Sequence, residues 1–361
     1  MSENPLFSPF NLHGIPLANR VVMAPMTRCR ATADHVPTAL MADYYAQRAT
    51  AGLIITEGVS PSPNGLGYAR IPGLYSDAQV EAWKAVTAAV HAAGGRVFAQ
   101  LMHTGRVGHP NNMPAGARIL APSAVGLGGT MWTDSAQMQP HPVPAEMTED
   151  DIHAAIADFV LGCARAIEAG FDGVELHGAN GYLIDQFLNT ATNRRTDRWG
   201  GSVENRMRFA VEVARQCALK IGGGRVGIRV SPYGVFNEMT PDADMDDLYR
   251  RLADEFGRLG LAYIHVVDHS AMGAPAVNDA IKQDIHAHFK GNVILSGGYD
   301  AARAGADLAA GKGELVAFGR PFISNPDLVR RLRDGLPLAE PHQGSFYTPG
   351  AKGYTDYPSA G

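Results

Sequence analysis

The sequence of 361 residues has few cysteines, no large excess of positive or negative charge, and no long apolar runs. Its three cysteines, Cys29, Cys163 and Cys217, are odd in number and far apart, which excludes a disulfide framework and a CxxC metal site. Charges interrupt every apolar stretch and the N-terminus has no signal-peptide pattern, so we expect no membrane partner. With 31 Lys and Arg against 36 Asp and Glu, and no basic cluster, we expect no nucleic-acid partner. A cytoplasmic globular protein is predicted.

A pattern of short β-branched apolar runs, each followed by a turn and an amphipathic helical stretch, repeats along the chain. Eight such units predict a parallel sheet, and eight strands are the number that closes into a barrel. A doubly wound open sheet is the alternative, but no linker or composition shift divides the chain. We therefore predict the α/β class, with a single (β/α)8 TIM-barrel domain over residues 1–361. The expected strands are Val21–Met26, Leu53–Glu57, Arg96–Met102, Asp172–His177, Val226–Ser231, Ala262–Val267, Val293–Ser296 and Leu315–Phe318, and the expected helices include Asp77–Ala93, Asp151–Ala169, Val203–Lys220, Met245–Leu259 and Asp327–Asp334.

Two segments depart from this rhythm. Residues 106–147, rich in Pro and Gly, separate the third strand from its helix and are predicted to be an insertion over the barrel mouth. Phe10–Arg20 is predicted to be a hairpin cap that plugs the barrel floor. The helix after the insertion should begin at a capping box formed by Thr148 and Asp151.

Glycines follow the last two strands, where barrels of this kind commonly bind phosphate. The segments are SGGY at Ser296–Tyr299 and FGRP at Phe318–Pro321. Glycines let backbone N–H groups approach an anion closely, and an arginine adds charge. The alternative is that these glycines only form tight turns. We predict a phosphate site formed by Gly297, Gly298, Gly319 and Arg320.

Polar residues at the ends of strands four and five form a second candidate site. Arg229 should point into the barrel, where it needs either a carboxylate such as Glu175 or an anionic ligand. His177, Asn180 and Tyr182 follow one another in HGANGY. Each alone is more often a packing or capping residue. Together they offer two donors for one oxygen and a phenol that can give a proton.

Two histidine pairs have the spacing of metal ligands but lack the other residues of a metal site. The pairs are His265 with His269 and His286 with His288. No HExxH motif and no acidic cluster lies near either pair in the sequence. We therefore interpret the first as a loop pair and the second as a solvated helix face. No metal site is predicted.

Longer motifs resemble those of the Old Yellow Enzyme family, and the resemblance is strongest to its classical bacterial branch. The likeness covers practically the whole chain, in matching order, and the NRRTDRWGGSVENR run is specific to this group and its near relatives. The motifs are APMT at Ala24–Thr27, QLMHTGR at Gln100–Arg106, HGANGYLIDQFLN at His177–Asn189, NRRTDRWGGSVENRMRF at Asn193–Phe209, FGRPFISNPDL at Phe318–Leu328 and GYTDYP at Gly353–Pro358.

The resemblance implies an FMN-dependent enzyme that uses NADPH or NADH to reduce activated C=C bonds of enones, maleimides or nitro compounds. Hydride would come from flavin N5 and the proton from Tyr182, while His177 and Asn180 hold the substrate oxygen. Monomer and homodimer are both compatible with it. The implied FMN contacts are Ala24, Pro25, Met26, Thr27, Gly58, Gln100, Arg229, Gly297, Gly298, Gly319 and Arg320, and the implied further pocket residues are Tyr68, Met102 and Tyr347.

The chain departs from the family pattern at two positions. Many bacterial members have His where this chain has Asn180, and many relatives have Trp where it has Met102. Both Asn and His donate to an oxygen, so the mechanism survives while ligand preference shifts. A flavin-free barrel lyase or isomerase that acts on a phosphorylated substrate is the alternative function, and a non-catalytic FMN carrier is a third.

Overall fold

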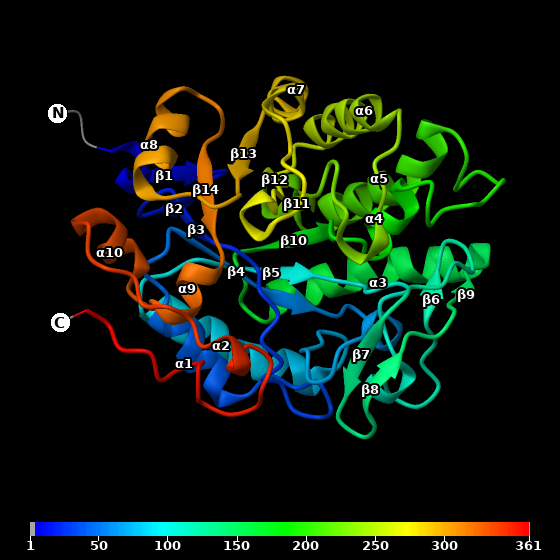
Figure 1. Cartoon of the computed structure of the whole chain (residues 1–361), viewed down its shortest axis with the longest axis horizontal. Helices are drawn as coiled ribbons and strands as arrows, with labels where there is room; N and C mark the ends of the chain where they lie inside the picture. Colours follow the sequence, from blue (N-terminus) through cyan, green and yellow to red (C-terminus); the bar gives the residue numbers. More distant parts are fainter. Residues whose placement is uncertain (1–3, 361) are drawn as a thin grey trace.

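The computed structural model describes residues 4–360, and eight parallel strands in it close into a barrel (Figure 1). Each strand pairs with its neighbour in sequence order, and the last barrel strand, β14, pairs with the first, β3. The predicted (β/α)8 barrel is therefore confirmed. The strands are β3 (Val21–Met23), β4 (Leu53–Val59), β5 (Val97–Leu101), β10 (Gly173–Gly178), β11 (Val226–Val230), β12 (Tyr263–Val266), β13 (Asn292–Leu295) and β14 (Leu315–Phe318).

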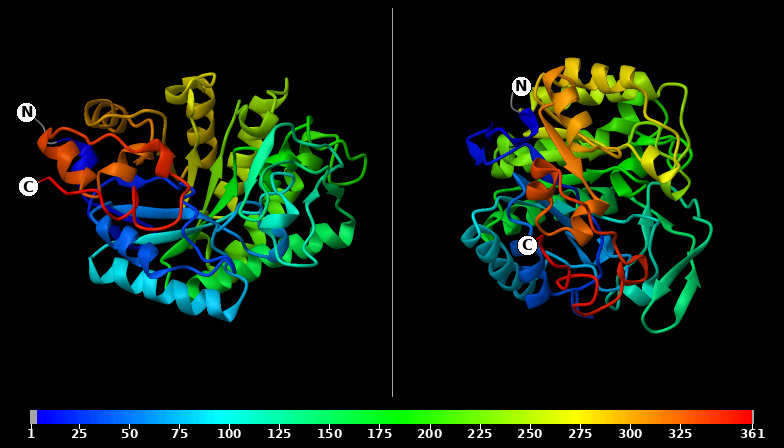
Figure 2. Two further views of the ribbon diagram at one scale, coloured as in Figure 1. Left: turned by 60° about the horizontal axis from the view of Figure 1, so that its bottom comes forward. Right: turned by 60° about the vertical axis from the view of Figure 1, so that its left-hand side comes forward.

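Helices follow the strands and surround the barrel (Figure 2). The predicted capping box at Thr148 is present at the start of α3, with Asp151 as its partner. No helix formed by residues 4–360 has the length and apolarity needed to cross a membrane. The helices are α1 (Ala39–Gln47), α2 (Asp77–Ala92), α3 (Glu149–Glu168), α4 (Leu183–Leu188), α5 (Val203–Ile221), α6 (Met245–Arg258), α7 (Asp279–Phe289), α8 (Ala301–Ala309), α9 (Arg320–Ser324) and α10 (Leu328–Asp334).

The first barrel strand is shorter than predicted, and the second is longer. β3 ends at Met23 instead of Met26, because Pro25 has no N–H to give to a ladder. β4 continues to Val59, with a register shift between Ile55 and Gly58. The residues after β3 are thereby free to leave the barrel wall and enter the mouth.

The barrel floor is closed by a hairpin of β1 (Phe10–Leu12) and β2 (Ile15–Leu17), as predicted. Leu12 and Leu17 are buried in one apolar cluster with inward-facing residues of the barrel, among them Phe98. Burying such side chains stabilises the fold by about 1.5–3 kcal/mol each. Ligands must therefore reach the barrel from its other end.

The segment between β5 and α3 contains short strands that the sequence did not indicate. β6 (Leu120–Ala121) pairs with β9 (Ala145–Glu146), and β7 (Thr130–Thr133) forms a hairpin with β8 (Gln137–Pro140) that projects from the barrel (Figure 1). Strands of two to four residues carry too few side chains for an alternating pattern to be recognisable.

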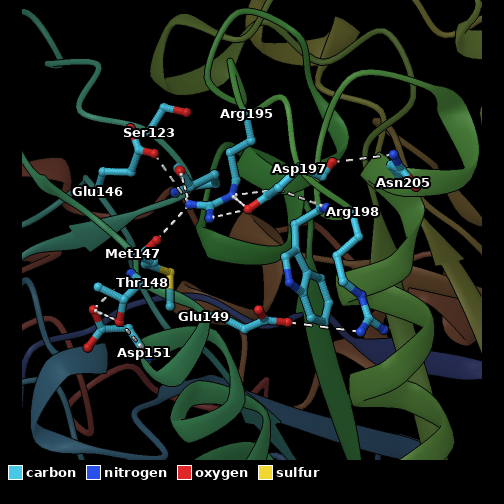
Figure 3. Close-up of polar contacts among 12 residues, drawn as sticks. Ser123, Glu146, Met147, Thr148, Glu149, Asp151, Arg195, Asp197, Arg198 and Asn205 are labelled. Atoms are coloured by element: carbon cyan, nitrogen blue, oxygen red, sulfur yellow. Dashed lines mark hydrogen bonds and ion pairs between the residues drawn. The ribbon is translucent and has the colours of Figure 1, made fainter.

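Arg195, from the loop between α4 and α5, ties this segment to the barrel (Figure 3). Its Nη1 atom donates to the carbonyl oxygens of Pro122 and Met147, at 2.9 and 2.6 Å. Asp197 holds the other side of the guanidinium at 2.6 Å from Nη2. One side chain thus holds the residues that directly follow β6 and β9 in this segment.

Candidate active site

A cavity of about 650 Å³ lies at the carboxyl ends of the barrel strands. It gathers residues from the ends of β3, β5, β10 and β11 and from the loops after β12, β13 and β14. The predicted site residues that line it are Ala24, Pro25, Met26, Thr27, Gln100, Met102, His177, Asn180, Tyr182, Arg229, Gly297, Gly298, Gly319, Arg320 and Tyr347.

Two predicted residues lie behind this lining. Gly58 is covered by Met102, whose Cε atom would be 2.5 Å from a Cβ added at Gly58. Tyr68 reaches the site indirectly, because its hydroxyl is 2.9 Å from the Tyr182 hydroxyl. Gly58 therefore leaves room for Met102, and Tyr68 supports Tyr182.

The glycines after β13 adopt backbone conformations that other residues rarely adopt. Gly297 has φ of +121° and Gly298 has φ of +63°. Arg303 donates to the Gly297 carbonyl at 2.8 Å, which fixes the turn. Arg320, at the start of α9, is exposed and lines the same cavity. A glycine turn and a guanidinium that line one cavity suit a phosphate group.

The Arg229 guanidinium is not paired with Glu175, although the two share one side of the barrel. Glu175 instead accepts hydrogen bonds from Gln100 Nε2, at 2.8 Å, and from His265 Nδ1, at 2.9 Å. Among residues 4–360, Arg229 Nε is buried and has no hydrogen-bond partner. Of the two alternatives for Arg229, pairing with Glu175 is therefore not found, and the buried donor is free for a ligand.

These features fit FMN. The side-chain amide of Gln100 donates a hydrogen bond to Glu175. The side-chain oxygen of Gln100 therefore remains to accept a hydrogen bond from a ligand N–H. The free donor of Arg229 suits the electron-rich edge of a flavin, and the glycine loops suit a phosphate. A ligand with an aromatic amide edge and a phosphate tail matches both ends of one cavity.

His177 and Tyr182 are neutral in this cavity. Burial, with a further contribution from the Arg229 charge, holds the pKa of His177 well below its ordinary value. Burial raises the pKa of Tyr182 to about 12. Their rings lie edge to face with centroids 4.9 Å apart. The site thus holds a neutral imidazole that can donate and a protonated phenol.

His265 and His269 do not form a loop pair. His265 lies on β12, fully buried inside the barrel, and only His269 lies in the loop. His269 lines the cavity, and its Nε2 atom is 2.9 Å from Asn180 Oδ1. His269 comes directly after the sixth strand, so the rule that site residues follow the barrel strands could have predicted it. His286 and His288 lie on α7, as expected, but both are only partly exposed and contact the carboxylates of Glu314 and Asp254.

The sequence also gave no indication of the apolar rim of the cavity. Phe236, Met272 and Leu338 line the cavity and are at least 43% exposed. Among residues 4–360, no group of three or more His, Cys, Asp or Glu side chains could hold a metal ion. Cys29, Cys163 and Cys217 are free and buried.

Comparisons with known proteins agree with this geometry. The model of the NADH:flavin oxidoreductase / NADH oxidase family matches residues 5–339. Chanoclavine-I aldehyde reductase of Penicillium roqueforti is 44% identical over 98% of this chain and 95% of that protein. A probable flavin mononucleotide-dependent alkene reductase of Leishmania infantum is 40% identical over 98% of this chain and 97% of that protein.

Solved structures of the same kind superpose on the whole chain. Morphinone reductase is 43% identical, covers 100% of this chain and 98% of its own, and has a TM-score of 0.94. The Old Yellow Enzyme homologue of Zymomonas mobilis is 41% identical, covers 98% of this chain and 99% of its own, and has a TM-score of 0.92.

The flavin-free lyase or isomerase is excluded by this family match. The chain belongs to the NADH:flavin oxidoreductase / NADH oxidase family, and it is an FMN-dependent, NAD(P)H-dependent ene-reductase of the bacterial Old Yellow Enzyme type.

Proposed function

We propose that this enzyme reduces the activated C=C bond of α,β-unsaturated carbonyl or nitro compounds, with His177 and Asn180 as oxygen ligands and Tyr182 as proton donor. The observation that supports this most is the convergence of these three side chains, from the end of β10 and the following loop, on the cavity that Arg229 also lines. Residues 1–361 are proposed to be one FMN-binding domain, with residues 106–147 covering its mouth.

FMN is proposed to lie between Arg229 and the glycine loops. Arg229 and Gln100 would hold its ring system, Thr27 would donate to it, and Gly298 and Arg320 would hold its phosphate. When bound, FMN would supply the redox chemistry, which is hydride transfer from NADPH or NADH to the β-carbon of the alkene.

His177 and Asn180 polarise the substrate. A carbonyl or nitro oxygen gains negative charge as the β-carbon accepts hydride, so donors aimed at that oxygen stabilise the transition state more than the bound substrate. His177 is neutral and can donate without adding a full charge. The low polarity of the buried site strengthens both hydrogen bonds.

Tyr182 delivers the proton to the α-carbon. Its raised pKa keeps the hydroxyl protonated across the physiological range. Once the proton has left, the Tyr68 hydroxyl, 2.9 Å away, can donate to the phenolate oxygen. Tyr68 is thereby proposed to support proton transfer without touching the alkene.

The rim of the cavity favours small organic substrates with apolar bodies. Phe236, Met272, Leu338 and Tyr347 expose apolar surface at its mouth, where such a body would lose contact with water. We propose small-molecule partners, a monomer or homodimer, and work in the reducing cytoplasm, where free cysteines are common.

Purified holoenzyme gives the direct test. Anaerobic NADPH or NADH should bleach the flavin absorbance, and 2-cyclohexenone should restore it. Bleaching that the enone does not reverse would contradict alkene reduction.

Tyr182→Phe tests the proton donor. It keeps the ring and removes the hydroxyl, so alkene reduction should slow on the order of 10²-fold while flavin reduction by nicotinamide is largely kept. Stopped-flow traces of the two half-reactions measure both. Tyr68→Phe is the matched control and should slow alkene reduction much less. An equal loss in both half-reactions of Tyr182→Phe would refute the assignment.

A further inference from the structure

His269 is a polar cavity residue that the mechanism above leaves without a role. It lies in the loop after β12, is half-buried, and lines the cavity together with Asn180. Its Nε2 atom is 2.9 Å from Asn180 Oδ1. An amide oxygen only accepts hydrogen bonds, so this contact requires a proton on Nε2.

The His269 ring is neutral. Burial, with a further contribution from the charge of Arg229, lowers its pKa to about 4. A neutral imidazole carries one proton, and the contact with Asn180 assigns that proton to Nε2. His269 is therefore a fixed donor toward the Asn180 side chain at neutral pH.

The other polar atoms of Asn180 are also held. Its N–H donates to Ser231 Oγ at 2.9 Å, and its carbonyl accepts from Asn237 Nδ2 at 2.8 Å. Ser231 Oγ in turn donates to Asp185 at 3.0 Å, which fixes the hydroxyl direction. These bonds hold the backbone at φ of +59°, a left-handed conformation that asparagine tolerates.

These contacts leave the side-chain NH2 of Asn180 able to bind a ligand. Within residues 4–360, no hydrogen bond engages Asn180 Nδ2, while Oδ1 is held by His269. An unrestrained amide can turn over at small cost and present either its oxygen or its nitrogen. With His269 as donor, only one of the two orientations is satisfied.

We propose that His269 is a positioning residue that turns the Asn180 NH2 toward the substrate and so makes the site selective for ligands with an acceptor oxygen. The inference rests on the proposed function, in which Asn180 binds the carbonyl or nitro oxygen. A ligand that offered only an N–H donor at this point would meet a second donor and be rejected.

Three substitutions separate the hydrogen bond from packing. His269→Gln keeps a donor, His269→Leu removes it, and His269→Glu supplies an acceptor that favours the reversed amide. The readout is the Kd of cyclohexanone, an unreactive ketone, for the oxidised holoenzyme, measured by isothermal titration calorimetry. We expect Gln within about threefold of wild type, Leu weaker by about tenfold, and Glu weaker than Leu. Leu binding as tightly as wild type, or Gln no better than Leu, would overturn the inference.

Asn180→Ala, alone and combined with His269→Leu, separates this inference from the proposed function. In support, Asn180→Ala weakens cyclohexanone binding and His269→Leu adds no further loss to it. If Asn180→Ala alone has no effect, the oxygen-binding role fails and the inference with it. If Asn180→Ala weakens binding but the His269 variants do not, only the inference fails.

FMN content and Tm of each variant exclude a general loss of structure. His288→Leu is the matched control, because it makes the same exchange at a half-exposed histidine of α7 paired with Asp254. It should leave the Kd of cyclohexanone unchanged.

Discussion

Glu57 of β4 is a buried carboxyl group that carries only part of its hydrogen bonds. Tyr45 donates its hydroxyl to one carboxylate oxygen at 3.1 Å, while the other oxygen is buried and has no partner among residues 4–360. Burial raises the pKa of Glu57 to about 7, against the opposing charges of Arg28 and Arg30. The folded chain thus favours the protonated form at a pH where the unfolded chain has lost the proton.

The raised pKa predicts how the free energy of unfolding depends on pH. Because the pKa of Glu57 in the folded chain lies above the ordinary value of 4.5, its stabilising contribution is present at low pH and is lost as pH rises toward 7. Glu57→Gln cannot ionise, so its stability relative to wild type should improve by on the order of 3 kcal/mol between pH 5 and pH 8. Thermal unfolding at the two pH values measures it. Glu255→Gln, at the surface of α6, is the control, and a Tm difference between Glu57→Gln and wild type that does not change with pH would contradict the assignment.

At the residue scale, the sequence predicted positions better than partners. Gln100, His177 and Arg229 could be placed at the barrel mouth because they end strands, and strand ends share one face of the barrel. The partner of Arg229 could not be predicted, because strand parity places Glu175 on the correct side without showing that Gln100 and His265 reach it first. For the same reason the contact of His269 with Asn180, 89 residues away, was missed.

At the element scale, Arg195 is one of the connections between the inserted segment and the barrel (Figure 3). The long helices were predictable because α3 and α5 each bury one face over many turns. The inserted strands were not, since they are short and two of them are largely exposed. The carbonyls that Arg195 binds next to β6 and β9 belong to the backbone, so no side-chain pattern reveals this contact.

Arg195→Met should therefore loosen the insertion without unfolding the barrel. It keeps an unbranched side chain but leaves the carbonyls of Pro122 and Met147 without their donor. The expected cost is on the order of 2 kcal/mol, confined to this segment. Hydrogen exchange should speed up in residues 118–147 and stay unchanged in β11 and β12. Arg198→Met, from the same loop but 58% exposed at its side chain, is the control. Uniform acceleration across the barrel would show that the contact supports the whole fold instead.

At the scale of the whole molecule, residues 345–353 near the end of the chain are bound by Arg28 and Arg30, just past β3. Arg30 is 3% exposed and forms no ion pair among residues 4–360. Its guanidinium donates to the carbonyls of Ser345, Phe346, Gly350 and Lys352. The number of units predicted a closed barrel, and the family resemblance placed Tyr347 in the pocket. The contacts that hold this segment could not be predicted, because any residue type can supply a backbone carbonyl.

Arg30→Met should release this C-terminal segment and, with it, part of the cofactor site. Several buried carbonyls would lose a charged donor at once, at a cost on the order of 3 kcal/mol. Because Phe346 and Tyr347 line the cavity, we expect faster proteolysis after residue 340 together with weaker FMN retention. Arg30→Lys should not rescue either property, since an ammonium group cannot span the separated acceptors that a planar guanidinium reaches. Arg333→Met, at an exposed position of α10, is the control. Release of the segment with unchanged FMN retention would show that the two ends of the chain stabilise the barrel but do not shape its cofactor site.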